Sequence, residues 1–177
     1  MSNPIPIVVL ASGRGSGFQA LIDAIDSHEL NAKIMGLVSD RSQVPVLEIA
    51  EKFQIPHFVV PYEECEQHSQ LLLEEILPLK PHFIVMSGYR RILTSSFINA
   101  FHSSQGYFRI TNIHPSLLPS FPGLHSYAQA YNYGCHVTGI TVHLVDHTLD
   151  QGPICAQQAF SLADCHSPEE VEKKGLS

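Results

Sequence analysis

An asparagine and a histidine, Asn112 and His114, stand two residues apart in a predicted β-strand. Side chains at positions i and i+2 of a strand point to the same face, about 6 to 7 Å apart, so both can reach one site. An asparagine amide donates hydrogen bonds, and an imidazole exchanges protons near neutral pH. Pro115 disfavours the helical conformation at His114 and ends the strand there. The pair is therefore expected at a strand end, where open α/β sheets bind ligands.

A carboxylate on a later loop would complete an Asn, His, Asp set. Asp150 stands in the stretch Leu149-Asp150-Gln151-Gly152-Pro153. By itself, an aspartate close to a glycine is also an ordinary turn former. Its chemical role therefore depends on the wider pattern of motifs in the chain.

The chain has 11 histidines, and for most of them simple packing or exposure is expected. His143 and His147 are four residues apart, but their segment alternates as a strand and then turns, so a helical metal-binding pair is not expected. His125 follows a loop glycine and is expected to be merely exposed.

A glycine-rich turn after the first predicted strand is a second candidate site. Residues 5–10 form a continuous apolar run typical of a buried parallel strand, and helical spacing begins at Phe18. Between them lies Ala11-Ser12-Gly13-Arg14-Gly15-Ser16-Gly17, which would present backbone N–H groups at a helix N-terminus to a phosphate. Anion binding is predicted, since an arginine and two serines are not needed merely to turn the chain; a plain tight turn is the alternative. No Lys-Ser/Thr pair follows the last glycine, which excludes a nucleoside-triphosphate P-loop.

A second turn, Ser87-Gly88-Tyr89-Arg90-Arg91-Ile92-Leu93, follows a predicted strand at its carboxyl end. Ligands bind at such ends. Adjacent arginines are usually solvated surface charge, and a pocket lined by the backbone of this turn is the alternative for Arg90. Thr94 has the character of a helix N-cap.

The segments alternate between strand and helix signals. Strands are predicted at 5–10, 33–39, 56–60, 83–86, 106–113, 138–145 and 153–160, and helices at 18–25, 46–53, 63–79, 94–101, 126–133 and from Ser167 onward. In the helix at 63–79, the inner side is expected to carry Leu71, Leu72, Ile76 and Leu79. Alternation in the first half indicates a parallel sheet with right-handed crossovers, and the short link between the last two strands favours an antiparallel pair. The predicted class is α/β, with a mostly parallel twisted sheet and antiparallel edge strands.

Composition bounds the class of protein. The 177 residues are 44% hydrophobic and 15% charged, with a formal net charge of −7, which favours one soluble domain and argues against a broad nucleic-acid surface. The N-terminal apolar run is too short for a signal peptide or a membrane span. The cysteines lack metal-ligand spacing and are expected to be free thiols of a cytoplasmic protein; they are Cys65, Cys135, Cys155 and Cys165.

Five motifs resemble, in order and context, the glycinamide ribonucleotide transformylases, also called phosphoribosylglycinamide formyltransferases. They are Ser12-Gly13-Arg14-Gly15-Ser16, Gly88-Tyr89-Arg90-Arg91-Ile92-Leu93, Asn112-Ile113-His114-Pro115-Ser116-Leu117-Leu118-Pro119, Pro122-Gly123-Leu124-His125 and Leu149-Asp150-Gln151-Gly152-Pro153. The resemblance covers nearly the whole chain. It implies a formyltransferase-like, Rossmann-type three-layer fold with one domain over 1–177. It also implies transfer of a formyl group from 10-formyltetrahydrofolate to the amine of glycinamide ribonucleotide in purine biosynthesis.

The resemblance also implies roles for individual residues. Asn112, His114 and Asp150 would be catalytic. The ribonucleotide phosphate would lie on Gly15, Ser16 and Gly17. The folate would be bound by Arg90, Arg91, Ile92, Leu93 and Asn112. The cosubstrate would be 10-formyltetrahydrofolate, with no metal, no nucleic-acid or membrane partner, and a monomer or weak homodimer as the working form.

The chemistry suits these residues. An amine that attacks a formyl amide forms a tetrahedral oxyanion, and the departing folate nitrogen needs a proton. Asn112 can donate an N–H to the oxyanion, and His114 can stabilise charge or move a proton. Asp150 would orient the imidazole and favour its charged form. No serine or cysteine nucleophile is needed, because the amine attacks directly.

Three positions depart from the family pattern. Gly17 stands where the family often has asparagine, and Cys65 stands near a position where the family can carry an arginine towards folate. The family continues beyond the equivalent of Ser177 with a helix that bears a substrate-contacting glutamate and with a closing helix. Weaker ribonucleotide binding and exposed apolar surface are therefore expected for this form.

Three other functions stay open at this level. Hydrolysis of 10-formyltetrahydrofolate needs the same Asn, His, Asp set with water as the acceptor. Formylation of an aminoacyl-tRNA is disfavoured by the acidic charge. A catalytically idle folate- or nucleotide-binding protein is the alternative from a different class.

Overall fold

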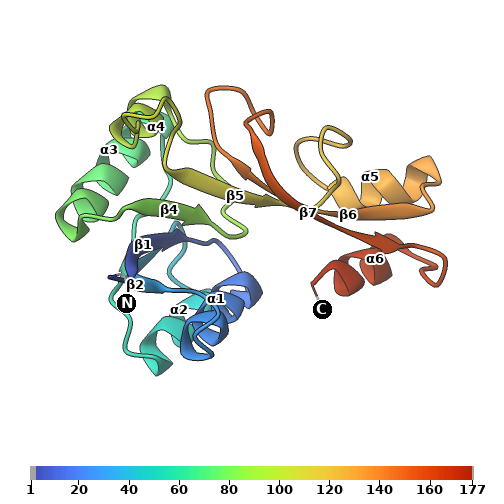
Figure 1. The fold of residues 1–177 in the computed structure, drawn as a ribbon, viewed down its shortest axis with the longest axis horizontal. Helices are drawn as coiled ribbons and strands as arrows, with labels where there is room; N and C mark the ends of the chain where they lie inside the picture. Colours follow the sequence, from blue (N-terminus) through green and yellow to red (C-terminus); the bar gives the residue numbers. More distant parts are fainter. Residues whose placement is uncertain (1–2, 177) are drawn as a thin grey trace. The chain divides into compact units, whose positions relative to one another are not determined.

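The structure is a computed structural model that describes residues 3–176. The chain divides into two compact units, Met1–Ile110 (unit 1) and Thr111–Ser177 (unit 2). Figure 1 shows the strands and helices of both units. No helix in residues 3–176 is long and apolar enough to cross a membrane.

Unit 1 is built on a parallel sheet. Its strands are β1 (Ile5–Leu10), β2 (Ala32–Ser39), β3 (His57–Val59) and β4 (Phe83–Met86). They lie in the order β3-β2-β1-β4, and every adjacent pair is parallel. The parallel sheet predicted from the alternating pattern is therefore confirmed. Since the strands run the same way, their carboxyl ends share one edge of the sheet.

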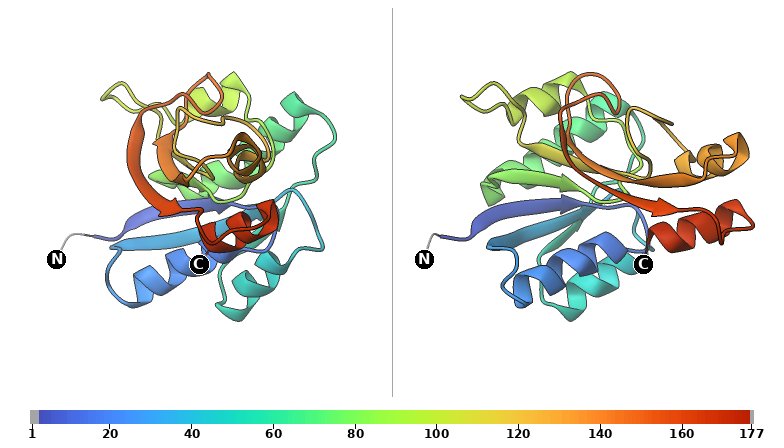
Figure 2. Two further views of the ribbon diagram at one scale, coloured as in Figure 1. Left: turned by 90° about the vertical axis from the view of Figure 1, so that its right-hand side faces the viewer. Right: turned by 45° about the vertical axis from the view of Figure 1, so that its right-hand side comes forward.

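Helices cover both faces of this sheet (Figures 1 and 2). They are α1 (Ser16–Asp26), α2 (Pro45–Lys52), α3 (Cys65–Ile76), the short 3₁₀ helix η1 (Leu77–Leu79) and α4 (Ser95–Ala100). Alternate residues of β1 pack with α1 and α2 in one buried cluster, which includes Ile7, Val9, Phe18, Ile22 and Val46. The helices α3 and α4 lie against the opposite face.

The long helix predicted at 63–79 is shorter in the structure. The α-helix ends at Ile76, and Leu77–Leu79 forms the 3₁₀ turn. Leu72 and Ile76 are fully buried as predicted, but Leu71 is 38% exposed, so its predicted inward position was wrong. Consecutive helical residues are rotated by about 100°, and in α3 the direction of Leu71 leads to solvent while that of Leu72 leads into the core.

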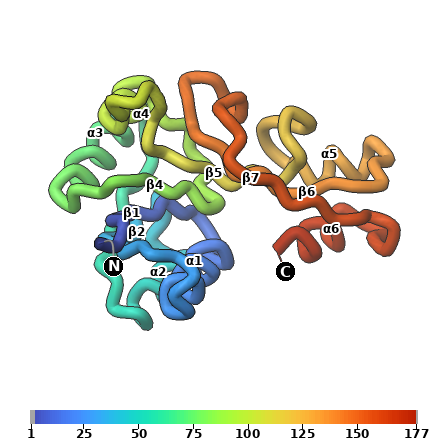
Figure 3. The backbone as a smooth tube through the Cα atoms, in the orientation of Figure 1, coloured from blue at the N-terminus to red at the C-terminus, as the bar shows by residue number. Residues whose placement is uncertain are grey.

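Unit 2 carries antiparallel strands. Its elements are β5 (Ile110–His114), whose first residue closes unit 1, α5 (Ser126–Tyr133), β6 (Val137–Leu144), β7 (Ile154–Ser161) and α6 (Pro168–Gly175). β5 pairs antiparallel with β6, and β6 pairs antiparallel with β7, as predicted for the last two strands. The hairpin from β6 to β7 can be followed in the trace of Figure 3.

The strand predicted at 106–113 begins later, at Ile110. Gly106 has a φ of 87°, and the Ser103 N–H donates to the Tyr107 carbonyl at 2.8 Å, so the chain turns here after α4. An isolated antiparallel bridge joins His102 and Phe108. The β-prone residues before Ile110 thus close a turn instead of extending the strand.

The helix N-cap predicted at Thr94 is confirmed, and two further helix ends are capped in the structure. The Thr94 Oγ1 accepts a hydrogen bond from the Phe97 N–H at 3.3 Å, and the Ser167 Oγ accepts one from the Glu170 N–H at 3.3 Å. Gly134 ends α5 in the left-handed conformation with φ 83°.

In unit 2, α5 and α6 pack through a small core that includes Tyr127 and Val171. Burial there raises the pKa of Tyr127 to about 12.

Candidate functional site

The pairing of β5 with β6 brings four polar side chains to one face in unit 2. Asn112 is directly opposite His143, and His114 is directly opposite Thr141. Opposed residues of an antiparallel pair project to the same side of the sheet, and so do residues two apart in one strand. The shared face predicted for Asn112 and His114 therefore also includes His143.

Asp150 lies against this face. Its Oδ2 is 3.4 Å from His114 Nδ1, and its Oδ1 is 3.7 Å from His143 Nε2. The Gly123 N–H donates to Asp150 Oδ2 at 2.8 Å, which holds the carboxylate in place. Asp150 has a φ of 54°, in the left-handed region that aspartate and asparagine tolerate better than most residues. The three side chains predicted to be catalytic thus lie together in unit 2.

His114 is held on both sides of its ring. Its Nε2 is 2.9 Å from the Phe121 carbonyl oxygen and 3.1 Å from the Ser126 Oγ, while its Nδ1 faces Asp150. A carbonyl oxygen and a carboxylate only accept hydrogen bonds. His114 therefore faces an acceptor at each ring nitrogen, the Phe121 carbonyl oxygen at Nε2 and the Asp150 carboxylate at Nδ1. The His114 side chain is only 4% exposed, so it would influence a ligand through Asp150 rather than by direct contact.

His143 is a site residue that sequence reasoning did not assign to the site. Its Nδ1 lies 2.9 Å from the Leu144 carbonyl oxygen and donates to it, so in the neutral ring Nε2 carries a lone pair. That lone pair accepts a hydrogen bond from Asn112 Nδ2 at 3.2 Å. The contact fixes which end of the Asn112 amide is the donor and leaves its second N–H available. The alternating strand pattern was visible, but the register that sets His143 opposite Asn112 was not.

A cavity of about 400 Å³ opens beside this network in unit 2. It is lined by Leu118, Pro119, Pro122, Asp150, Gln151, Gly152 and Ile154. A Cβ on Gly152 would lie 1.8 Å from the Leu144 carbonyl oxygen, so this loop requires glycine to reach its position. The carboxylate of Asp150 is a charged group in a largely apolar wall. The cavity can therefore present a substrate amine to a carboxylate.

The glycine-rich turn is the N-terminus of α1 in unit 1. Gly15 is the N-cap with φ 82°, and a Cβ there would lie 2.8 Å from Val46 Cγ2, so both conformation and packing require glycine. Ser16 is exposed and no side chain of the described residues caps the helix. The first N–H groups of a helix have no partner within it. The predicted phosphate-binding residues Gly15, Ser16 and Gly17 therefore stand in suitable backbone geometry, and their role stays a prediction.

The turn predicted to bind folate lies next to the glycine-rich turn in unit 1. The Arg90 N–H donates to Ser12 Oγ at 3.0 Å, and the Ser12 N–H donates to the Gly88 carbonyl at 3.3 Å. Ile92 is 68% exposed, whereas Leu93 is buried. This turn therefore offers both an exposed apolar side chain and a fixed backbone.

The structure also places two other residues discussed in the sequence, His125 and Cys65. His125 is exposed, as the sequence suggested, and it is the N-cap of α5, in the left-handed conformation. Cys65 is the first residue of α3, and its Sγ lies 3.7 Å from the Ile92 carbonyl oxygen. Within residues 3–176, no three or more His, Cys, Asp or Glu side chains are grouped to hold a metal ion.

Comparison with known proteins identifies the family. Residues 5–177 match the model of the formyl transferases. The chain belongs to the formyl transferase family. It is 37% identical over 169 residues to a phosphoribosylglycinamide formyltransferase of Bacillus subtilis (strain 168), covering 94% of this chain and 84% of that protein.

Solved structures agree with this assignment. Glycinamide ribonucleotide transformylase 1 from Symbiobacterium toebii superimposes with a TM-score of 0.92 and 31% identity, covering 99% of this chain and 82% of that one. A formyltetrahydrofolate deformylase from Pseudomonas syringae pv. tomato gives a TM-score of 0.89 at 26% identity, with 99% and 57% covered. The predicted formyltransferase-like α/β fold, with mostly parallel strands and an antiparallel edge, is confirmed.

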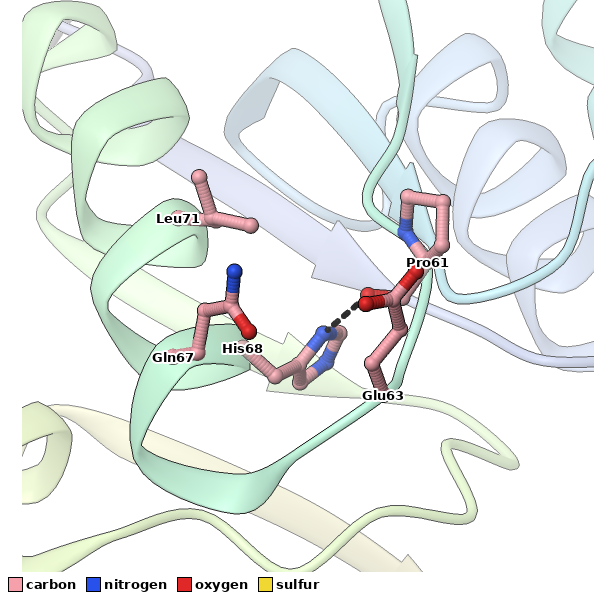
Figure 4. A pocket seen from close by; sticks show the side chains of 5 residues that line it. All are labelled: Pro61, Glu63, Gln67, His68 and Leu71. Carbon is pink, nitrogen blue, oxygen red and sulfur yellow. Dashed lines mark hydrogen bonds between the residues drawn. The ribbon is translucent and has the colours of Figure 1, made fainter.

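This formyl transferase also has a smaller cavity of about 110 Å³ in unit 1, beside α3 (Figure 4). His68 lines it, and its Nδ1 donates to the Pro61 carbonyl at 3.1 Å. The Nε2 then accepts a hydrogen bond from the Tyr89 hydroxyl at 2.5 Å. Burial lowers the pKa of His68 and raises the pKa of Tyr89. The lowered pKa favours the neutral ring of His68, and this ring holds the turn that contains Tyr89 through the hydrogen bond from the Tyr89 hydroxyl.

We expect the stability of this formyl transferase to fall on mild acidification, in part through His68. The pKa of His68 is lowered in the folded protein, so on acidification the unfolded chain binds a proton at this residue first. The contribution of His68 to stability is therefore complete above the pKa of the unfolded chain, about 6.5, and is lost as the pH falls towards the pKa of the folded protein. Urea unfolding at about pH 7.5 and about pH 5.5 should therefore show a smaller loss for His68→Gln than for wild type. The variant His136→Gln, at an exposed position, is the control and should keep the wild-type loss. Equal losses in wild type and His68→Gln would contradict the prediction.

Proposed function

We propose that this protein is a phosphoribosylglycinamide formyltransferase, which transfers the formyl group of 10-formyltetrahydrofolate to the amine of glycinamide ribonucleotide. The observation that carries the proposal is the network of Asn112, His143, Asp150 and His114 in unit 2 of a formyl transferase chain. The relatives that share this name support the choice of acceptor. Both substrates are small molecules, and no metal is needed for the steps below.

Asn112 would stabilise the oxyanion that forms when the amine attacks the formyl carbon. Its amide is oriented by His143, so a free N–H points away from that ring. An oriented donor stabilises developing charge better than a mobile one because it does not need to reorganise. His143 is a positioning residue in this scheme, and Asn112 is the residue that touches the reacting oxygen.

Asp150 would receive the proton that the attacking amine loses. It is the ionisable group of the network that lines the cavity. The same proton can then pass to the folate nitrogen as the bond from that nitrogen to the formyl carbon breaks, so the proton count balances. His114 acts through Asp150, since its Nδ1 lies 3.4 Å from Asp150 Oδ2 and positions the carboxylate.

Unit 1 would supply the binding groups. We assign the ribonucleotide phosphate to the backbone at Gly15, Ser16 and Gly17, because the N-terminus of a helix attracts anions. We assign the folate to Arg90, Arg91, Ile92, Leu93 and Asn112, as the family resemblance implies. Residues 1–177 would work as one formyltransferase domain, as a monomer or weak homodimer.

A cytoplasmic location is part of the proposal. All four cysteines are free thiols, which suits a reducing compartment. Neither a nucleic-acid nor a membrane partner is proposed.

One assay tests the function. The purified protein is supplied with 10-formyltetrahydrofolate, with and without glycinamide ribonucleotide, and both formylated ribonucleotide and formate are measured. Formylated product that requires the ribonucleotide is the expected result. Release of formate at the same rate without ribonucleotide would instead identify a deformylase, a possibility raised by the Pseudomonas syringae structure. Folate binding without either product would indicate an idle binding protein.

A further inference from the structure

The turn from Gly88 to Leu93 is fastened by side chains from several parts of unit 1. Ser12 accepts from the Arg90 N–H, and His68 accepts from the Tyr89 hydroxyl. The Thr94 N–H, just after the turn, faces Ser69 Oγ at 3.4 Å. These contacts hold the two flanks of the turn. The guanidinium of Arg91 is held separately.

Arg91 is held by Asp40, the residue that follows β2. The Arg91 Nε lies 2.6 Å from Asp40 Oδ2, and the Asp40 side chain is completely buried while that of Arg91 is 29% exposed. The guanidinium also lies over the Tyr62 ring, 4.4 Å from its centroid. Arg41 is at 3.9 Å from the same oxygen and is 49% exposed, which makes it a weak partner. Asp40 therefore fixes Arg91 in one orientation against Tyr62.

Stability alone does not account for Asp40. Its Oδ1 is buried without a hydrogen-bond partner among the described residues. Burying a charged group costs desolvation energy, and an unpaired carboxylate oxygen adds to that cost. A buried ion pair is therefore weak evidence for a stabilising role, and a role in fixing a specific geometry explains it better.

We propose that Asp40 is a positioning residue for the folate-binding turn: through Arg91 it fixes the backbone of residues 90–93 in the conformation that receives the folate. The proposal rests on the assignment of this turn to folate under the proposed function. The side chain of Asp40 is too buried to meet a ligand without rearrangement. Its effect reaches the ligand through the Arg91 guanidinium and the main chain that carries it.

The first test is the kinetics of Asp40→Asn, which keeps the shape of the side chain and removes its charge. We expect the KM for 10-formyltetrahydrofolate to rise by roughly tenfold, the size of an ordinary coupling between contacting residues. We expect kcat and the KM for glycinamide ribonucleotide to change by less than about twofold, because the network in unit 2 is untouched. Arg41→Ala removes the weak second partner of Asp40 and should behave as wild type. A purely structural role would lower thermal stability without this selective change in KM.

A double-mutant cycle separates positioning from direct binding. If Asp40 acts through Arg91, then Asp40→Asn, Arg91→Gln and the double variant should show clearly non-additive effects on the KM for folate. Additive effects, or an unchanged KM in Asp40→Asn, would overturn the proposal. If Asp40→Asn does not fold, Arg91→Lys replaces the partly exposed partner, and a folate KM equal to that of wild type would then overturn it, since lysine lacks the Nε–H that meets Asp40.

Failure of the proposed function can be told apart from failure of this inference. If the wild-type protein shows no ribonucleotide-dependent formyl transfer, the proposed function is wrong, but the role of Asp40 in folate binding can still be tested. Isothermal titration with 5-formyltetrahydrofolate measures folate affinity directly in the same variants. Weaker binding by Asp40→Asn in that titration supports the positioning role, and equal binding overturns it.

Discussion

Replacing Asp150 with asparagine is expected to lower kcat for formyl transfer by about 10²- to 10⁴-fold, the range for loss of a positioned acid or base. The asparagine keeps the shape of the side chain and tolerates the left-handed φ of 54°. The amide oxygen of the asparagine can still accept the hydrogen bond from the Gly123 N–H. The charge that pairs with His114 and can take the amine proton is lost. The loss should therefore appear in kcat, with the fold retained.

The measurement is steady-state kinetics with both substrates, accompanied by thermal unfolding of the same preparation. Asp164→Asn is the matched control, because Asp164 is an exposed aspartate of unit 2 that pairs with Lys174 on α6. It should retain wild-type kcat. A folded Asp150→Asn variant with nearly wild-type turnover would contradict a role for this carboxylate in proton transfer.

Asn112→Ala is expected to lower kcat by about 10²- to 10³-fold, the typical cost of losing one oxyanion donor. The KM for glycinamide ribonucleotide should change little, because the donor interacts most strongly with the charge that develops during the reaction. Truncation also removes the hydrogen bond to His143 Nε2, so that the ring loses its partner on β5. The main effect nevertheless falls on the reacting oxygen.

Asn132→Ala is the control for this second prediction. Asn132 lies exposed on α5 of the same unit, where alanine favours the helix. Single-turnover measurements separate the chemical step from product release in both variants. Should Asn112→Ala raise the KM for folate and leave the chemical step unchanged, the oxyanion role would be wrong and Asn112 would act in folate binding alone.

Much of the secondary structure could be predicted, since its signals are local. The β-branched run of β1, the N-cap serine and proline at the start of α6, and Gly134 at the end of α5 each act within a few residues. The errors occurred where tertiary contacts compete with local preference. Leu71 has the same apolar character as Leu72, and only packing decides which of the two is buried.

The candidate site divides in the same way. The i, i+2 spacing of Asn112 and His114 and the turn that carries Asp150 are properties of the sequence, because strand geometry and turn chemistry follow from adjacent residues. The register that places His143 opposite Asn112 was decided by the fold. So was the salt bridge that joins Asp40 and Arg91 across 51 residues.

The sequence by itself thus determined which chemical groups are present and which strand or turn carries each of them. The tertiary structure decided which groups meet, that Asp150 faces the cavity, and that His114 lies behind it. The physical reason is that strand register and long-range pairing depend on the packing of distant segments, whose free energy no local pattern of residues records.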